Sequence, residues 1–334
     1  MPDLSVVLIA RNQAWNVARL VESVLEQTAS CASREIVLVD SASDDGTASQ
    51  AARYPIRVYR LRAGQRLTAA AGRYVGLNRT AGDLVLFLDG DMELCQGWLE
   101  KAVEVCGQRP DVAVVTGLVI DRPLHTARSE AFVVEQAETP VPLVDVKHGG
   151  GAALYRRAVL DEVGAFNPHF YSDEEPELCV RIRRRGYRIV ELACPAVCHY
   201  TEPHEAISTL FARWKRRLYF GPGQILRYHL GSRVFWSYLA ERGFGCLPAL
   251  GLAVGVLSLL LSLLTGQWAW LGLWALALVA VVLLMLYRKR SVHQALYTLV
   301  RRALMMAGMW RGFLMRPLAP DAYPALVDEI GREE

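Results

Sequence analysis

Short apolar runs alternate with longer amphipathic stretches through the first part of the chain. Runs typical of buried strands occupy residues 4–10, 35–40, 56–61 and 84–88. The stretch after the first run has apolar residues at helical spacing, namely Val17, Leu20, Val21, Val24 and Leu25. Strands that alternate with helices indicate an α/β fold with a doubly wound, mostly parallel sheet. Right-handed crossovers then place the carboxyl ends of the strands along one crevice.

The fourth run ends in the acidic turn Asp89-Gly90-Asp91. Carboxylates at the carboxyl end of a parallel strand are expected to meet a ligand. Gly90 removes side-chain bulk between them and lets the backbone approach that ligand. Two hard oxygen donors at this spacing suit Mg²⁺ or Mn²⁺ shared with a diphosphate. A solvated turn is the competing explanation, because Asp-Gly is also a common turn dipeptide.

A series of motifs in fixed order covers roughly residues 4–200. It comprises Val6-Val7-Leu8-Ile9 with Asn12, Glu35 to Thr47 around Asp40-Ser41, Arg73-x-x-Gly76-Leu77, Ala81-Gly82-Asp83, Phe87-Leu88-Asp89-Gly90-Asp91, Gly149-Gly150-Gly151-Ala152, Val163-Gly164-Ala165-Phe166, and Glu174-Glu175-Pro176-Glu177-Leu178 with Arg181 and Gly186-Tyr187. The ordered set resembles the family 2 glycosyltransferases. The resemblance implies an A-type glycosyltransferase fold that binds a nucleotide-diphosphate sugar.

The resemblance also implies roles for matching positions. The nucleotide-sugar-binding positions are Ala10, Asn12, Asp40, Arg73, Asp89 and Gly90. Among them, Asp40 would select the nucleoside and Arg73 would lie near the diphosphate. Tyr74 departs from the family, because relatives often have asparagine there.

The metal is implied to be Mg²⁺ or Mn²⁺, bound by Asp91. Asp89 contacts either the ribose or the metal, and His199 is a further candidate ligand. An ordinary surface or core histidine explains His199 equally well.

Residues 173–177 place four acids in five positions around Pro176. Pro176 suits the first helical position, which predicts Glu175 as the N-cap. A carboxylate crowded by like charges has a raised pKa, which suits a general base. The family usually has Glu-Asp here, and Glu175 stands in the place of that aspartate. We therefore predict Glu175 as the base, with Glu174 and Asp173 as alternatives; an acidic helix start that complements the helix dipole is the structural explanation.

We place Gly150, Gly151 and Glu174 on the acceptor side of the site. Consecutive glycines let the backbone pass close to a bound group, although a tight turn into an edge strand explains them too. Trp214 joins this side, because Phe211-Ala212-Arg213-Trp214 is similar to the Gln-x-x-Arg-Trp signature of processive relatives. Leu210 stands at the glutamine position, so we do not predict processive polymerisation.

Residues 243–287 carry no charge. Residues 247–265 and 268–287 are each close to the ~20 residues that span a bilayer, which predicts a transmembrane helical hairpin. Arg242 precedes the hairpin and Arg288-Lys289-Arg290 follows it, so the positive-inside rule places both ends in the cytoplasm.

Four regions follow from these patterns. Residues 1–205 form the nucleotide-sugar-binding domain, 206–242 a basic juxtamembrane segment, 243–287 the hairpin, and 288–334 a basic interfacial segment with a C-terminal tail. The two basic segments are expected to rest on anionic membrane lipids, and a third span within 291–316 is the less favoured alternative. Deletion from residue 243 onward is expected to leave nucleotide binding intact, because the motifs lie upstream.

The formal net charge of +3 gives no case for nucleic acid as a partner. The seven cysteines show no regular framework, which suits a reducing cytosol. Together with the resemblance, these patterns predict a membrane-anchored inverting glycosyltransferase on the cytoplasmic side of the cytoplasmic membrane. Its acceptor would be lipid-linked or a cell-envelope glycan. The alternatives are a catalytically silent scaffold subunit that binds nucleotide sugars, and a polyprenyl-phosphate sugar synthase.

Overall fold

The first apolar run becomes the central strand of the parallel part of a β-sheet in the computed structural model. This strand, β1 (Leu4–Ala10), pairs in parallel with β2 (Arg34–Asp40) on one side and β4 (Leu84–Asp89) on the other. β3 (Arg57–Leu61) continues the parallel pairing beyond β2. The four runs identified in the sequence therefore form neighbouring parallel strands, as predicted.

Further strands, some of them antiparallel, extend this sheet on both sides. The order is β10-β3-β2-β1-β4-β8-β6-β9-β5, with β7 paired to β9. The added strands are β5 (Met92–Leu94), β6 (Val112–Arg122), β7 (Leu143–Asp145), β8 (Ala152–Arg156), β9 (Arg188–Tyr200) and β10 (Val327–Ile330). β8 runs antiparallel to both β4 and β6. The sheet is therefore mixed: β1 to β4 form the predicted parallel part, β6 also pairs in parallel with β9, and every antiparallel pair involves β5, β7, β8 or β10.

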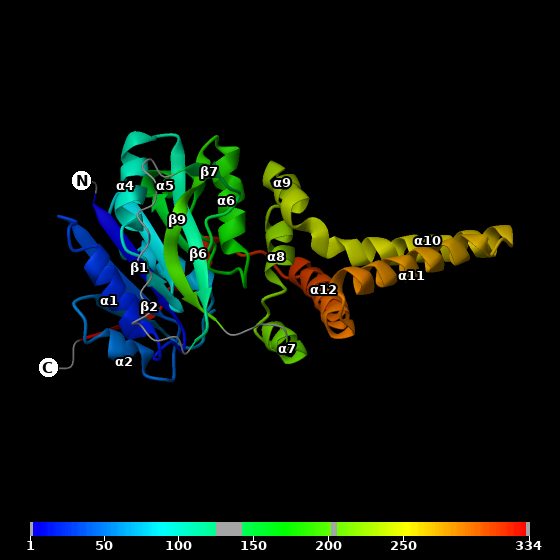
Figure 1. Cartoon of the computed structure of the whole chain (residues 1–334), viewed down its shortest axis with the longest axis horizontal. Coiled ribbons are helices and arrows are strands. Elements are labelled where there is room, and N and C mark those ends of the chain that lie inside the picture. Colours follow the sequence, from blue (N-terminus) through cyan, green and yellow to red (C-terminus); the bar gives the residue numbers. More distant parts are fainter. Residues whose placement is uncertain (1–2, 125–141, 202–205, 332–334) are drawn as a thin grey trace. The chain divides into compact units, whose positions relative to one another are not determined.

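Helices cover both faces of the sheet (Figure 1). α1 (Val17–Gln27), α2 (Thr47–Ala51) and α4 (Trp98–Gln108) share one apolar core with Val6 and Leu8 of β1. The opposite face carries α3 (Ala69–Leu77), α5 (Arg157–Val163) and α6 (Glu174–Arg184), which pack with Val7 and Ile9. Alternate residues of β1 thus serve opposite faces, as expected for a strand buried on both sides.

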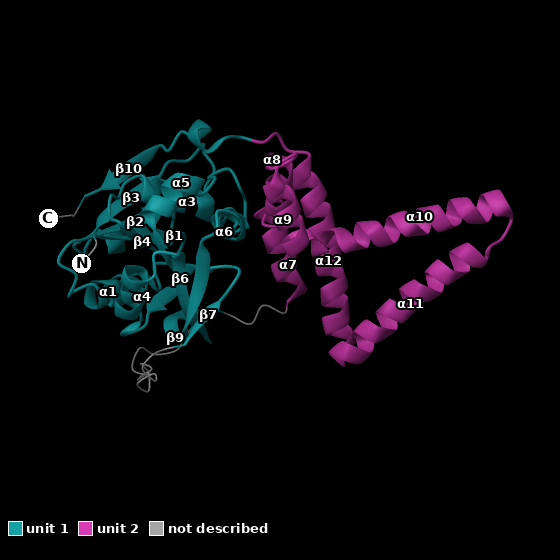
Figure 2. Ribbon diagram, turned by 90° about the horizontal axis from the view of Figure 1, so that it is seen from above, with its two compact units in different colours: residues 1–202, 318–334 teal, residues 203–317 magenta. Residues whose placement is uncertain are grey.

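The structure describes residues 3–124, 142–201 and 206–331, and these fall into two compact units (Figure 2). Unit 1 comprises Met1–Glu202 and Leu318–Glu334, and unit 2 is Pro203–Pro317. The domain boundary expected at residue 205 lies outside the described residues. Unit 2 is therefore inserted between two parts of the chain that fold together.

The tail after residue 317 is part of the sheet domain. β10 pairs antiparallel with β3, from Val327 opposite Leu61 to Ile330 opposite Val58 (Figure 2). Before it, the short 3₁₀ helix η3 (Pro320–Ala322) leads to Tyr323, which is buried. This strand was not predicted: residues 288–334 were expected to form a basic interfacial segment and a C-terminal tail.

Unit 2 is helical in its described residues. Its elements are α7 (Ile207–Lys215), α8 (Gly221–Tyr228), α9 (Arg233–Arg242), η2 (Gly243–Cys246), α10 (Leu247–Thr265), α11 (Ala269–Lys289) and α12 (Val292–Phe313). α12, which was expected to be an interfacial amphipathic segment, is one helix that packs against α7 and α8.

α10 and α11 form a hairpin around a turn at Gly266, whose φ is 72°. The Trp274 indole donates a hydrogen bond to the Gly251 carbonyl at 3.0 Å, and a Cβ on Gly255 would come within 2.7 Å of the same ring. Among the described residues, the segments Arg233–Thr265 and Ala269–Lys289 are long and apolar enough to cross a membrane. Most of their large apolar side chains are exposed, so both are candidate membrane spans.

Candidate active site

The carboxyl ends of three parallel strands bring the predicted acids together. In the strand register, Ala10 at the end of β1 lies opposite Asp40, and Ile9 lies opposite Asp89. Asp40 and Asp89 therefore flank the end of β1, one strand away on either side. This is the position where open α/β sheets bind their ligands.

Arg73 on α3 joins two acids of this site. Its Nη2 donates to Asp89 Oδ1 at 2.6 Å, and its Nη1 donates to Glu174 Oε1 at 2.5 Å. Arg73 and Glu174 are buried, whereas the Asp89 side chain is 33% exposed. Burial raises the pKa of Glu174, and Arg73 opposes that rise. Arg73 thus fixes Asp89; its place near a diphosphate stays a prediction.

Asp91 lies beside His199 because β5 and β9 pair antiparallel, with Met92 opposite His199. His199 Nε2 is 3.5 Å from Asp91 Oδ2, and Nδ1 is 2.7 Å from Asp121 Oδ1. The hydrogen bond to Asp91, supported by the one to Asp121, raises the pKa of His199 to about 9. Without a bound metal ion, the imidazole ring is therefore protonated at neutral pH.

Asp91 keeps an unused acceptor. Its Oδ1 atom is buried and has no hydrogen-bond partner among the described residues. A buried carboxylate oxygen without a donor is costly, and a bound cation would satisfy it. Within the described ranges, no group of three or more His, Cys, Asp or Glu side chains is arranged to hold a metal ion. Asp91 and His199 fit a metal whose other ligands are phosphate or water oxygens, as is usual for Mg²⁺.

The acidic block begins α6, but its N-cap differs from the prediction. The N-cap is Asp173, with φ of 59°, so the helix begins at Glu174 and Pro176 is its third residue. Proline is tolerated throughout the first helical turn, so the position of Pro176 does not determine which residue is the N-cap.

Glu175 points back to the three-glycine turn. Its Oε1 accepts hydrogen bonds from the Gly149 N–H at 2.5 Å and from Cys179 Sγ at 2.9 Å. Both bonds end on Oε1. At the other end of the turn, a Cβ on Gly151 would lie 2.5 Å from Asp89 Oδ2. Glycine at residue 151 is therefore required for Asp89 to occupy its position, and the turn connects the surroundings of Asp89 with those of Glu175.

Asp40 has no accessible surface. It accepts hydrogen bonds from the Ser43 N–H at 3.0 Å and from the Ser43 hydroxyl, and burial raises its pKa. Asn12, with φ of 54°, is held against the same loop, because its N–H donates to Ser43 Oγ at 2.8 Å. A direct contact between Asp40 and a nucleoside would require the Ser43 loop to move.

Trp214 and Tyr74 each have an aromatic partner within their own unit. Trp214 is on α7 of unit 2, where its ring packs against Phe220 and the Arg311 guanidinium lies 5.1 Å from its centroid. Tyr74, the departure from the family pattern, packs edge-to-face against Tyr323 of the tail, with ring centroids 6.1 Å apart.

Several residues that shape the site carry no local sequence signal. Asn16 is buried, and its Nδ2 donates to the Gly90 carbonyl at 2.9 Å and the Met92 carbonyl at 3.0 Å. It therefore fixes the backbone on both sides of Asp91. Asp121 and Cys179 were also missed. Asp121 acts through His199, which is remote in sequence, and Cys179 acts through Glu175, one helical turn earlier.

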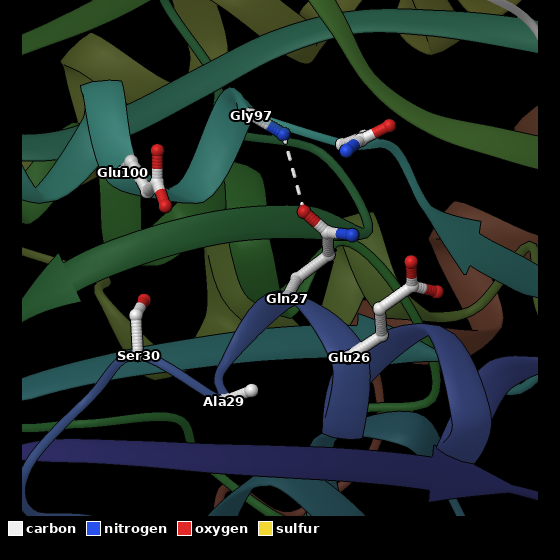
Figure 3. Close-up of a pocket in the computed structure, with 7 residues that line it drawn as sticks. Glu26, Gln27, Ala29, Ser30, Gly97 and Glu100 are labelled. Carbon is white, nitrogen blue, oxygen red and sulfur yellow. Dashed lines mark hydrogen bonds between the residues drawn. The ribbon is translucent and has the colours of Figure 1, made fainter.

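A separate hollow of about 290 Å³ lies between the end of α1 and the start of α4 (Figure 3). It is lined by Glu26, Gln27, Ala29, Ser30, Gln96, Gly97 and Glu100. The Gly97 N–H donates to Gln27 Oε1 across it at 3.1 Å. None of the candidate-site residues lines this hollow.

Residues 5–164 match the model of glycosyl transferase family 2. The chain contains a family 2 glycosyltransferase domain. A mannosyltransferase from Pyrobaculum calidifontis, solved in complex with GDP-Man and Mn²⁺, has a similar fold, with a TM-score of 0.60 at 19% identity over 94% of this chain and 87% of that one. The A-type glycosyltransferase fold predicted from the motifs is thereby confirmed.

Two curated relatives show the range of similarity. Glycosyltransferase AglE of Haloferax volcanii is 24% identical over 231 residues, which are 67% of this chain and 74% of the relative. Human polypeptide N-acetylgalactosaminyltransferase 15 is 35% identical over 127 residues, 36% of this chain. This chain spans only 20% of the length of the human relative.

Proposed function

We propose that the protein is a membrane-anchored, metal-dependent glycosyltransferase that acts with inversion. It moves a sugar from a nucleotide-diphosphate donor to a lipid-linked or cell-envelope glycan acceptor at the cytoplasmic leaflet. The observation that carries the proposal is Asp91: its Oδ1 is buried and has no partner among the described residues, and its Oδ2 lies 3.5 Å from His199 Nε2. The mannosyltransferase of similar fold, whose structure contains GDP-Man and Mn²⁺, supports the choice of donor and metal.

Asp91 and His199 would hold Mg²⁺ or Mn²⁺, which neutralises the charge that develops on the leaving diphosphate. His199 must lose its proton to act as a ligand, so metal binding would release that proton. Asp89 remains fixed by Arg73 and presents its other oxygen toward Gly151.

Glu175 would take the proton from the acceptor hydroxyl. Glu174 is a weaker candidate, because its Oε1 is bound to Arg73 inside the domain. Both hydrogen bonds to Glu175 end on Oε1, and they orient the carboxylate. Displacement in one step needs one base and no carboxylate nucleophile, which gives a product of inverted anomeric configuration.

The helical unit would anchor the enzyme. α10 and α11 supply the apolar spans, and the basic residues around them favour the cytoplasmic leaflet under the positive-inside rule. Residues 206–240 contain six Lys or Arg and no acid, and residues 291–316 contain no acid either. This charge complements anionic lipid headgroups.

A screen of nucleotide sugars against membrane extract, with the mass of the glycosylated product as readout, tests the proposal. Purified full-length protein should transfer sugar from one donor, and Asp91→Ala should abolish the transfer. Binding of a nucleotide sugar without turnover under any condition would instead support the scaffold alternative. A product on free polyprenyl phosphate would assign the protein as a polyprenyl-phosphate sugar synthase.

A further inference from the structure

The tail of unit 1 makes specific contacts with two segments that lead into the active site. The first is the α3 lead-in, residues 62–68, which precedes the helix that carries Arg73. The second is the α6 lead-in, residues 167–171, which precedes Asp173 and the acids of α6. Tyr323 lies between them, only 5% exposed.

Tyr323 contacts both lead-ins directly. Its hydroxyl donates a hydrogen bond of 2.7 Å to the Arg66 carbonyl in the α3 lead-in. Its ring packs edge-to-face on His169 of the α6 lead-in, with centroids 5.7 Å apart, and on Tyr74 of α3 at 6.1 Å. The tyrosine that replaces the family's asparagine at residue 74 thus has a structural partner in the tail.

The two lead-ins are also bonded to each other. The Arg66 guanidinium donates to the His169 carbonyl and lies 4.7 Å from the centroid of the Tyr171 ring. Thr68 donates to the Pro168 carbonyl at 3.1 Å and, as the N-cap of α3, accepts from the Ala71 N–H. The next elements along both segments then meet at the bond between Arg73 and Glu174.

Other tail residues secure the same segments. The Asn167 side chain donates to the Leu318 carbonyl at 3.0 Å. The Gln65 side chain binds Leu326 through both ends of its amide group: Nε2 donates to the carbonyl and Oε1 accepts from the N–H. The tail therefore contacts the α3 lead-in and the α6 lead-in at several independent points.

We propose that Tyr323 is a positioning residue for glycosyl transfer: it holds the two lead-ins in the register that brings Arg73 onto Asp89 and Glu174 and sets Glu175 beside the glycine turn. This inference rests on the proposed function, and it assigns part of the active-site geometry to a segment that lies beyond the helical unit in the sequence. Reacting groups displaced by about 1 Å can lose roughly 100-fold in rate. A residue that sets the spacing of donor-side and acceptor-side groups therefore acts on kcat.

The test compares Tyr323→Ala, Tyr323→Phe and Val327→Ala in the full-length protein. Val327 is the matched control, because it packs in the same apolar cluster as Tyr323 but, as the first residue of β10, pairs with β3. Tyr323→Ala should lower kcat about 10- to 100-fold with a smaller change in the KM for the donor. Tyr323→Phe keeps the ring contacts and should recover most of that loss, and Val327→Ala should keep wild-type kcat despite lower thermal stability.

Hydrogen–deuterium exchange of the same proteins provides a readout that does not depend on activity. Tyr323→Ala should accelerate exchange in peptides covering residues 62–72 and 167–178, and Val327→Ala should not. Unchanged exchange in these peptides, or equal loss of kcat in Tyr323→Ala and Val327→Ala, would overturn the positioning role. If wild-type protein transferred no sugar at all, the proposed function would fail, and the exchange data would still decide whether Tyr323 holds the lead-ins.

Discussion

Arg73 and Glu174, which are 101 residues apart in the chain, are joined by a hydrogen bond of 2.5 Å between Nη1 and Oε1. Because the other arm of the guanidinium binds Asp89, one buried cation compensates two carboxylates. Such an arrangement is costly to break on one side, since the remaining charges stay in place without a partner.

Arg73→Met should therefore destabilise unit 1 by about 3 kcal/mol, because it leaves Glu174 buried without its cation. Arg62→Met is the matched control: Arg62 pairs with Asp328 on the surface, with exposed fractions of 55% and 50%. An exposed pair contributes at most about 1 kcal/mol. Urea denaturation of the purified protein measures both variants, and equal effects would show that the Arg73 pairs contribute no more than a surface pair.

Asp91→Asn should reduce turnover by at least about 100-fold, with less effect on donor binding, because the charge that a metal stabilises develops as the diphosphate leaves. Asp83→Asn, an isosteric change at an exposed residue just before β4, should leave turnover unchanged. Steady-state kinetics with added Mn²⁺ and after EDTA treatment make the comparison. Full turnover in the presence of excess EDTA would refute metal dependence.

Glu175→Gln should abolish transfer while donor affinity stays within a few-fold, because the amide keeps the shape but does not accept the proton. Glu174→Gln and Asp173→Asn, tested in the same assay, show whether a neighbour is the base instead. Glu175→Asp should retain some activity, since the family resemblance implies an aspartate at this place. A product with the donor's own anomeric configuration, determined by NMR, would exclude single displacement.

A reporter fused after Arg290 should be active only in the cytoplasm, because the hairpin of α10 and α11 returns the chain to its starting side. The control fusion, at Gly266 in the turn between the helices, should report the opposite side. Activity of the Arg290 fusion outside the cytoplasm would reverse the proposed topology.

The sequence predicted the parallel strands, the acidic turn and the helical hairpin, because each leaves a local signal: an apolar run, a pair of acids or a long uncharged segment. It did not predict that Glu174 binds Arg73, since no local pattern relates residues on different helices. It also missed β10, whose four residues Val-Asp-Glu-Ile are too short and too polar to stand out. The predicted N-cap of α6 was wrong, because proline is compatible with several positions in a first helical turn.

Because the chain returns to pair β10 with β3, a minimal catalytic domain must include the tail as well as residues 1–201. A stop codon after Arg242, which the motif positions alone would favour, removes an edge strand and Tyr323 together with the hairpin. Unit 2 is topologically a long insertion, so a protease that cuts it once leaves two fragments that still share a sheet. Fragment complementation follows from this: residues 1–201 should gain thermal stability when a synthetic peptide of residues 318–331 is added, because the peptide restores the missing strand. Engineering of a soluble form therefore requires two junctions rather than a single truncation.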